Sequence, residues 1–550
     1  MRAPSTLSPT GSTRWSLPRI LLLFCLLNVG LLALEVARHT GFGPNRLALE
    51  ALVLTGALGL LAGRRGGHWL ALTGAGLATI LLAMALGDAL ARYSLNRPLN
   101  LGLDLHLLLS VFHLIEGNVS VAAAWLASVL AALALLLFAV AVYALLRYLP
   151  VRARAWSGAG VVYQLMLLAG LVGLLGQELL PTPPRTITPA LSMVEDQAYW
   201  VERTRQERRQ FSALLQETHE AESRLALTGL AETDVIIGFI ESYGVSAVFD
   251  ERYTPEVVPQ LERLEERAEA AGLHLVSGTV NAPVFGGQSW LAHATLLSGL
   301  WIDSHLRYEL LLQTRRNTLV DDFAAGGHHT VALMPAITLP WPEGRWYGFD
   351  RLLESADFPY AGPPFNWVTM PDQYTWSHFQ ESVRAEAPEP VFAKLALISS
   401  HAPWVPILPV IDDWSVIGDG EIFNQWEGKG EAPSALWRDH DRVREHYARS
   451  VAYSLEVSSA YIEAFPEENE NALVILIGDH QPAPIITGPD PSAGVPVHVL
   501  SADPRLLEPF RERGFIDGAM PPDAYTEHSM ADIRGWLREA FGESARLAAR

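Results

Sequence analysis

The chain has 550 residues, 49% of them hydrophobic, and its net charge of −20 divides into +6 over residues 1–181 and −26 over residues 182–550. Because nucleic-acid binding needs a basic face, the large acidic part argues against nucleic acid as a partner. Cys25 is the only cysteine, so an intrachain disulfide and a Cys-based zinc site are both excluded.

The first third of the sequence contains five apolar stretches that are long enough, or nearly so, to cross ~30 Å of hydrocarbon as helices. The second stretch is the shortest and carries Glu50 near its start. No small-residue cleavage site follows the first stretch, so we expect a retained helix there and not a signal peptide. The sequence predicts a bundle of about five transmembrane helices within residues 1–181, at Leu17–Val36, Leu47–Ala62, Trp69–Ala91, Val119–Leu146 and Ser157–Leu180.

The arginines that flank these stretches predict the orientation of the bundle. Eight lie on the side of the N-terminus: Arg2, Arg14, Arg19, Arg64, Arg65, Arg147, Arg152 and Arg154. Four lie on the other side: Arg38, Arg46, Arg92 and Arg97. Since basic residues collect in cytoplasmic loops, we expect a cytoplasmic N-terminus and a multi-pass protein of the cell inner membrane. Five spans would then place everything after Leu180 on the outer, periplasmic side.

Two segments near the spans are more polar. Residues 96–117 are apolar but interrupted by acidic and histidine side chains. This favours either a helix at the outer interface or a loop packed over the bundle. Residues 182–232 begin with prolines and continue, over Asp196–Leu227, with Arg and Glu at helix-neighbour spacings. We interpret residues 182–232 as a solvated helical linker to a catalytic domain at residues 233–550.

From Thr233 onward, short apolar runs alternate with amphipathic stretches, which predicts an α/β domain with a mostly parallel sheet. The expected strands are Val235–Ile240, His274–Val276, Thr330–Leu333, Phe392–Ile398, Leu473–Ile477 and Val495–Leu500. The expected helices are Thr254–Ala271, Ser289–Leu300, Tyr308–Ala325, Asp372–Arg384, Ser434–Ala464 and Tyr525–Phe541.

Polar side chains follow three of the predicted strands. Glu241 comes directly after the first strand, His401 follows the strand Phe392–Ile398, and Asp479 and His480 follow Leu473–Ile477. In open α/β sheets the ligand site lies beyond the carboxyl ends of the strands. We therefore expect these residues to converge. Two carboxylates and an imidazole suit a divalent cation such as Mn²⁺ or Zn²⁺.

A glycine-rich turn precedes one predicted helix. Gly286 and Gly287 let the backbone approach a ligand closely. Ser289 then opens the helix, where backbone N–H groups and the helix dipole favour an anion. A helix-capping serine would show the same pattern, so this motif alone does not decide between a cap and a functional hydroxyl.

Taken together, these motifs resemble the alkaline-phosphatase/sulfatase superfamily, in its membrane-anchored branch of lipoteichoic-acid synthases and phosphoglycerol transferases. The matching residues are Glu241-Ser242, the Gly-rich segment with Ser289, His401-Ala402-Pro403-Trp404 and Gly478-Asp479-His480. The order of several spans before an exported catalytic domain also matches.

The resemblance implies roles for individual residues. Glu241, Ser289, Asp479 and His480 would hold one divalent metal, Mn²⁺ in first place, with Zn²⁺ or Mg²⁺ as alternatives. Ser289 would be the nucleophile, and His401 would contact the substrate phosphate or assist the leaving group. Trp341 and Arg345 fall roughly where the family has substrate contacts, and His293 stands where an acid is common.

The implied function is a metal-dependent phosphotransferase that moves a phosphoglycerol-type group from a phospholipid donor to a glucan, glycan or polymer acceptor. Three alternatives remain open at this point. A sulfatase-like phosphomonoester or phosphodiester hydrolase would use the same intermediate, and a phosphoethanolamine transferase would share the architecture. A membrane scaffold or sensor without activity would be expected to have lost the metal ligands.

Overall fold

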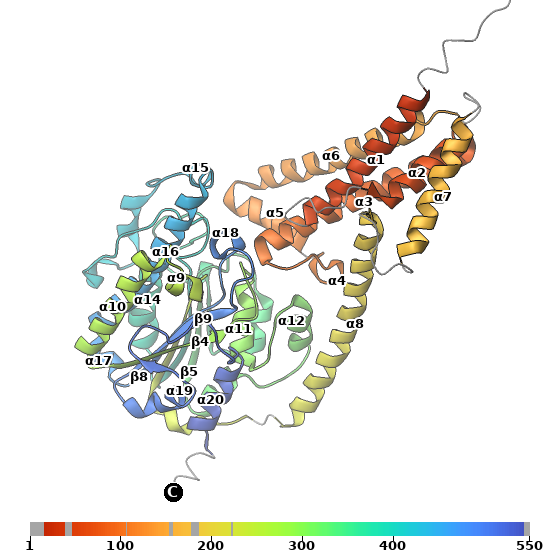
Figure 1. Ribbon diagram of the computed structural model, residues 1–550. Coiled ribbons are helices and arrows are strands. Elements are labelled where there is room, and N and C mark those ends of the chain that lie inside the picture. Colours follow the sequence, from red (N-terminus) through yellow and green to blue (C-terminus); the bar gives the residue numbers. More distant parts are fainter. Residues whose placement is uncertain are drawn as a thin grey trace, which may run out of the picture. The chain divides into compact units, whose positions relative to one another are not determined.

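The computed structural model describes residues 16–38, 47–105, 107–152, 158–177, 186–221 and 224–543. The chain forms two compact units (Figure 1). The first comprises Met1–Arg92 and Arg97–Arg205, and the second Tyr93–Asn96 and Gln206–Arg550. Several residues named in the predictions lie outside the described ranges: Arg2, Arg14, Arg46, Arg154, Ser157, Leu180 and the prolines that open the linker.

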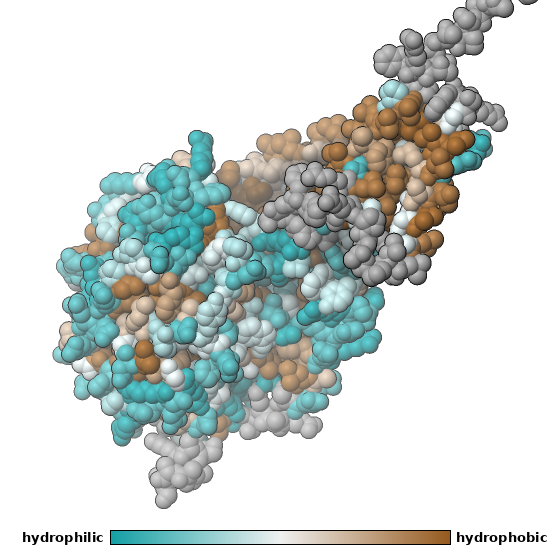
Figure 2. All heavy atoms as spheres, in the orientation of Figure 1, coloured by the Kyte–Doolittle hydropathy of each residue, from teal (hydrophilic) through white to brown (hydrophobic). Residues whose placement is uncertain are grey.

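Among the described residues, four helices of the first unit are long and apolar enough to cross a membrane. They are α1 (Ser16–Arg38), α3 (Arg65–Leu95), α6 (Val121–Tyr148) and α7 (Ala159–Gln177). Figure 2 shows the side chains of this unit's helices as a largely hydrophobic surface. Four of the five predicted spans are therefore present as long apolar helices.

The second predicted span is wrong in length. It forms α2 (Leu49–Leu60), whose 12 residues reach only ~18 Å as a helix. α2 runs antiparallel to α7, because Gly56 lies against Leu167 and Gly170 against Val53. A methyl group on Gly56 or Gly170 would come within 2.7 Å of the facing residue, so small residues let these two helices approach closely.

Glu50, the acid in this apolar stretch, has a structural partner. Its carboxylate accepts hydrogen bonds from the backbone N–H groups of Ala190 and Leu191 at 3.1 and 3.2 Å. These groups belong to the first turn of α8 (Pro189–Ala221), where a helix has N–H donors without intrahelical partners. The linker helix therefore begins at Pro189, seven residues before the predicted stretch Asp196–Leu227, and it ends at Ala221.

Residues 96–117 form two short helices, α4 (Leu101–Asp104) and α5 (Leu107–Asn118). The buried carboxylate of Asp104 accepts two hydrogen bonds from the guanidinium of Arg97, at 2.7 and 2.9 Å. Of the two expected alternatives, an interfacial helix or a packed loop, the described residues show helix in two pieces. The acid at 104 is paired within the segment.

The second unit contains an eight-stranded sheet in the order β10-β4-β9-β8-β3-β7-β5-β6. Five neighbouring strands from β8 to β6 are parallel, whereas β9 is antiparallel to both β8 and β4, and β10 is antiparallel to β4. The mostly parallel sheet is thus confirmed. The strands are β3 (Asp234–Ile240), β4 (His274–Asn281), β5 (His329–Met334), β6 (Arg351–Glu354), β7 (Val391–Leu397), β8 (Ala472–Gly478), β9 (Gly494–Ser501) and β10 (Ile516–Asp517).

Helices cover both faces of the sheet (Figure 1). On β3, Ile236 and Ile240 join a core with residues of α10 (Thr254–Ala270) and α16 (His440–Ala464). Phe239 has the opposite orientation and packs against His293 of α11 (Ser289–Ser298), with ring centroids 4.2 Å apart. Because both faces are buried, β3 consists almost entirely of apolar residues.

Four predicted helices differ from the structure. The stretch 372–384 is α14 (Asp372–Phe379) followed by a π-helix, Gln380–Arg384. The stretch 308–325 is two helices, α12 (His305–Leu312) and α13 (Leu319–Ala325), because Thr318 and Asp321 form a capping box that starts a new helix. Asp439 caps α16, which separates it from the short α15 (Pro433–Leu436). The last predicted helix is shorter, and α20 spans only Asp532–Phe541.

Candidate active site

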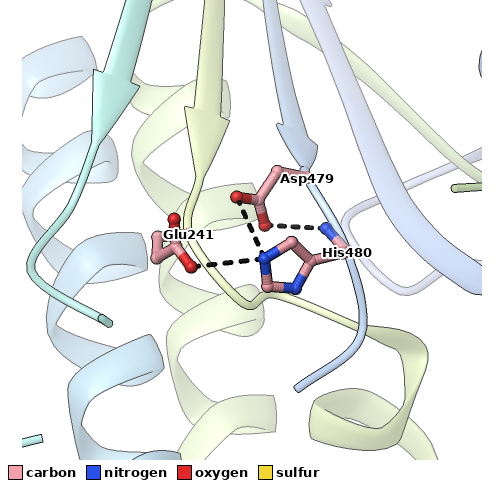
Figure 3. A group of neighbouring side chains, drawn as sticks. All are labelled: Glu241, Asp479 and His480. Atoms are coloured by element: carbon pink, nitrogen blue, oxygen red, sulfur yellow. Dashed lines mark hydrogen bonds and ion pairs between the residues drawn. The ribbon is translucent and has the colours of Figure 1, made fainter. Parts of the chain in front are cut away.

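Glu241, Asp479 and His480 lie together at the carboxyl edge of the sheet (Figure 3). Glu241 directly follows β3, and Asp479 directly follows β8, the parallel neighbour of β3. Ile240 at the end of β3 pairs with Gly478 at the end of β8. One ligand atom from each of the three side chains lies within 4.8 Å of the others, and all three residues are buried. This group could hold a divalent cation, as the positions after the strands predicted.

Backbone and side-chain hydrogen bonds fix the orientation of these ligands. Asp479 Oδ1 accepts from the N–H groups of Ser242 and His480, both at 2.7 Å. His480 Nδ1 lies 2.9 Å from the carbonyl of Gln481, which assigns the ring proton to Nδ1. His480 Nε2 faces Glu241 Oε1 at 3.4 Å and Asp479 Oδ2 at 3.7 Å, so a cation bound between these groups would displace the proton from Nε2. An imidazole held in this way is suited to bind a metal ion.

Two buried carboxylates and an imidazole also shift one another's proton affinities. Burial raises the pKa of Asp479, and the negative charge of Glu241 raises it further. Burial would raise the pKa of Glu241 too, but the hydrogen bond from His480 and the charges of His401 and His480 hold it below its usual range. The raised pKa of Asp479 means that two adjacent buried carboxylates disfavour each other's charge, and a bound cation would relieve this repulsion.

The motif residues between these ligands have packing reasons of their own. A Cβ on Gly478 would lie 1.8 Å from the carbonyl oxygen of Tyr243, so only glycine lets β8 approach the end of β3. Ser242 adopts a left-handed backbone with φ of 56°, which turns its N–H toward Asp479. A non-glycine residue in this region costs energy, and such residues cluster at functional sites.

The hydroxyl of Ser289 lies in the same cluster. Ser289 Oγ donates to Glu241 Oε2 at 3.0 Å and lies 3.3 Å from His480 Nε2. Ser289 is the first residue of α11, and the preceding Gln288 occupies the cap position with a left-handed backbone. Gly286 and Gly287 are also left-handed, with φ of 66° and 139°. Because the hydroxyl points to the acidic cluster and does not cap the helix, the functional interpretation of this serine is favoured.

His401 lies on the loop after β7, next to the cluster. Its neighbour Ser400 donates a hydrogen bond to the backbone carbonyl of Glu241 at 2.6 Å. His401 Nδ1 contacts the carbonyl of Ala402 at 2.6 Å, and its ring lies 5.7 Å from that of Trp367. The imidazole is half-buried and close enough for its charge to lower the pKa of Glu241.

The three residues predicted to contact the substrate lie in different parts of the domain. The backbone N–H of Trp341 donates to Glu354, at the end of the edge strand β6, which lies three strands from β3 in the sheet order. Arg345 is exposed in the following short helix, Pro342–Tyr347. His293, one turn after Ser289, is buried, and its Nδ1 lies 2.8 Å from Lys394 Nζ.

Lys394 is a residue of this region that sequence reasoning missed. It lies in the middle of β7 and is 1% exposed. Its ammonium contacts His293 and Met334 Sδ, both at 2.8 Å, and the ring of Phe239 at 5.7 Å from the centroid. Burial lowers the pKa of Lys394 to about 7 and that of His293 well below its usual value. The sequence signal that could have identified this residue is a lysine in the middle of an otherwise apolar seven-residue strand.

No family model and no curated protein matches the chain. Among solved structures, lipooligosaccharide phosphoethanolamine transferase A from Neisseria meningitidis is 13% identical over 95% of both chains, with a TM-score of 0.44. A Streptococcus pyogenes phosphoglycerol transferase in complex with sn-glycerol-1-phosphate is 13% identical, over 62% of this chain and 94% of that one, with a TM-score of 0.35.

The lipoteichoic acid synthase LtaP from Listeria monocytogenes is 14% identical, with a TM-score of 0.32. That match covers 47% of this chain, which spans 59% of the Listeria structure. In its four motifs and in the order of its parts, the chain resembles the membrane-anchored branch of the alkaline-phosphatase/sulfatase superfamily.

Proposed function

We propose that the chain is a metal-dependent phosphotransferase of the inner membrane, with Ser289 as its nucleophile. The observation that carries the proposal is the position of Ser289 Oγ, 3.0 Å from Glu241 and 3.3 Å from His480, at the start of a helix. In this proposal residues 1–181 form the membrane domain, 182–232 the linker and 233–550 the exported catalytic domain.

Glu241, Asp479, His480 and Ser289 form the ligand set for one divalent cation, Mn²⁺ in first place. Such an ion would lower the pKa of the Ser289 hydroxyl and neutralise charge on the phosphoryl oxygens. Hard carboxylate and hydroxyl oxygens favour Mn²⁺ or Mg²⁺, whereas the imidazole also suits Zn²⁺.

The reaction proceeds in two displacements at phosphorus. Ser289 Oγ forms a bond to the phosphorus of the phospholipid headgroup while the bond from phosphorus to the diacylglycerol oxygen breaks. The serine proton leaves toward Glu241, which already accepts its hydrogen bond. His401 supplies a proton to the departing diacylglycerol oxygen. The products are diacylglycerol and a phosphodiester on Ser289.

The second displacement reverses these roles. His401 takes the proton of an acceptor hydroxyl, whose oxygen attacks phosphorus while the bond to Ser289 Oγ breaks. Glu241 returns its proton to the serine oxygen. With a sugar or polymer hydroxyl as acceptor, the enzyme is a transferase, and with water it is a hydrolase. A phosphoglycerol-type group is the main proposal, and a phosphoethanolamine group is the alternative.

The proposed topology has a cytoplasmic N-terminus and five crossings. Four are the long apolar helices, and the fifth would be α2, whose ~18 Å would require a locally thinned bilayer. Support comes from the antiparallel contact of α2 with α7, in which the Cβ position of Gly173 lies 2.8 Å from Leu49 and that of Gly59 2.2 Å from Tyr163. α2 therefore runs along most of α7, from near its last turn to near its first. An odd number of crossings places the catalytic domain in the periplasm.

Product analysis of the purified full chain tests the proposal. The chain is incubated with Mn²⁺ and either phosphatidylglycerol or phosphatidylethanolamine, with and without a glucan acceptor. We expect diacylglycerol release that depends on Ser289, and a phosphorylated acceptor when the glucan is present. Diacylglycerol without acceptor modification would favour the hydrolase. If neither lipid yields diacylglycerol, the proposed donor class is wrong.

A further inference from the structure

Two loops of the candidate active site each carry a left-handed residue that is not glycine. Ser242 directly follows Glu241 and has a φ of 56°. Trp404 lies three residues after His401 and has a φ of 61°. Such a backbone costs energy in a residue with a side chain, so the surrounding structure must supply contacts that keep it in place. The proposed reaction uses Glu241 and His401, and their positions depend on these two loops.

Consecutive residues of α16 bind the carbonyls of these two left-handed residues. The hydroxyl of Tyr447 donates to the carbonyl of Ser242 at 3.0 Å. Nδ1 of His446 lies 3.1 Å from the carbonyl of Trp404, and because a carbonyl only accepts, the ring proton is on Nδ1. One helix thus holds both the loop that follows β3 and the loop that follows β7.

Packing and further hydrogen bonds join the two loops to each other. The rings of Tyr447 and Trp404 meet edge-on, with centroids 5.6 Å apart, and both side chains are buried. Trp404 Nε1 donates to the carbonyl of Ser400 at 2.8 Å. Ser400 Oγ donates in turn to the carbonyl of Glu241 at 2.6 Å. The two loops and α16 therefore form one connected unit.

The contact at Ser242 reaches the acidic ligands through short hydrogen bonds. The N–H of Ser242 donates to Asp479 Oδ1 at 2.7 Å, and its hydroxyl donates to Glu241 Oε1 at 3.0 Å. One residue thereby orients both carboxylates, and groups that orient metal ligands in this way raise metal affinity. Without the Tyr447 hydroxyl, the carbonyl of Ser242 would lose its side-chain donor, and the turn that carries both hydrogen bonds would loosen.

We propose that Tyr447 and His446 are positioning residues of the active site. Tyr447 holds the Glu241–Ser242 turn in the conformation that binds a divalent cation. His446 holds the loop of His401 in the conformation from which the imidazole transfers a proton. The roles of the cation and of His401 rest on the proposed function, whereas the hold on the two loops is a property of the fold alone. Tyr447 therefore acts on metal affinity, and His446 acts on the rate.

Hydrogen exchange of the metal-free, detergent-purified full chain measures the hold on the first loop. Tyr447→Phe keeps the buried ring and removes only the hydroxyl. We expect amide exchange to become roughly tenfold faster in the peptide that contains residues 241–244. Tyr253→Phe is the matched control, because Tyr253 is equally buried, packs 5.3 Å from the ring of Tyr447 and donates to the carbonyl of Ile486 at 2.7 Å. Parental exchange in Tyr447→Phe, or the same increase in Tyr253→Phe, would overturn the proposal.

Titration of the same chains with Mn²⁺ alone measures the effect on the metal ligands. The dissociation constant of Tyr447→Phe should rise roughly tenfold above that of the parent, and that of Tyr253→Phe should equal it. Parental affinity in Tyr447→Phe would contradict the effect on the ligands. A parent that binds no Mn²⁺ would refute the ligand set of the proposed function, and hydrogen exchange would then decide by itself whether Tyr447 holds the turn.

A pair of variants tests His446. His446→Leu removes the donor, whereas His446→Asn offers an amide N–H in a similar position. We expect His446→Leu to release diacylglycerol roughly tenfold more slowly with unchanged Mn²⁺ affinity, and His446→Asn to recover most of the rate. An equal loss in both variants, or none in His446→Leu, would overturn this role.

The same pair gives a result without turnover. Exchange in the peptide that contains residues 399–404 should become faster in His446→Leu and stay near the parental rate in His446→Asn. If the parent releases no diacylglycerol, or if Tyr447→Phe does not fold, this comparison decides. Equal exchange in the two variants would then contradict the proposal.

Discussion

Replacing Lys394 by methionine should stabilise the chain in a pH-dependent way. The lysine is buried and contacts His293, Met334 and the ring of Phe239, and no carboxylate among the described residues is paired with its ammonium. Burial lowers its pKa from 10.5 to about 7, although the charge of Asp479 opposes the shift. At ~1.36 kcal/mol per pKa unit, the charged lysine destabilises the folded state by about 5 kcal/mol.

The sign of the pH effect follows from the protons bound in each state. Between about pH 7 and pH 10.5 the unfolded chain holds the Lys394 proton and the folded chain does not, so stability rises with pH by up to ~1.4 kcal/mol per unit. Below about pH 7 both states are protonated, and the destabilisation is present in full. Lys394→Met removes this dependence. Its stability advantage should therefore shrink by ~2 kcal/mol between about pH 7.5 and pH 9.

Denaturant unfolding of the detergent-purified full chain, followed by tryptophan fluorescence, measures this difference. Lys429 is the only other lysine in the sequence and is exposed, so Lys429→Met is the matched control and should behave as the parent does. A stability difference for Lys394→Met that does not change with pH would refute the argument from a buried, uncompensated ammonium.

Three further predictions concern the metal, the proton transfer and the topology. Asp479→Asn should lower the bound divalent cation from about one per chain to near zero in elemental analysis, whereas the exposed Asp412→Asn should not. Full metal content in Asp479→Asn would show that the ligand set is wrong. His401→Gln should slow diacylglycerol release by roughly a hundredfold or more, and an unchanged rate would remove His401 from the proton transfer. Reporter fusions at Gly67 and Pro181 should be cytoplasmic and exported respectively, and the reverse at either position contradicts five crossings.

The convergence of Glu241, Asp479 and His480 could be predicted because it depends on local patterns alone. Each residue follows a run of apolar residues, and parallel neighbouring strands end at the same edge of a sheet. The two strands must also pair in a register that brings their last residues side by side, and the pairing of Ile240 with Gly478 meets this requirement. The hydroxyl of Ser289 was predicted as a candidate, but only the structure distinguishes it from a helix cap.

The differences arise where tertiary contacts override the local pattern. α2 ends at Leu60, before a turn in which Gly63 has a φ of 81°, and it is packed against α7 through contacts that the sequence pattern does not reveal. The strand β6 (Arg351–Glu354) was missed because four residues of mixed polarity have no clear period. The sequence shows Lys394 as a charged residue within an apolar run. It does not show the contact with His293, because His293 lies 101 positions away in the chain.

The central claim is that Ser289 forms a covalent bond to phosphorus. The most direct measurement is the intact mass of the full chain after incubation with Mn²⁺ and a phospholipid donor, without an acceptor, followed by peptide mapping. We predict a gain equal to one phosphoglycerol or phosphoethanolamine group, located on Ser289 and absent from Ser289→Ala. Diacylglycerol release by Ser289→Ala at the parental rate would contradict the proposed mechanism.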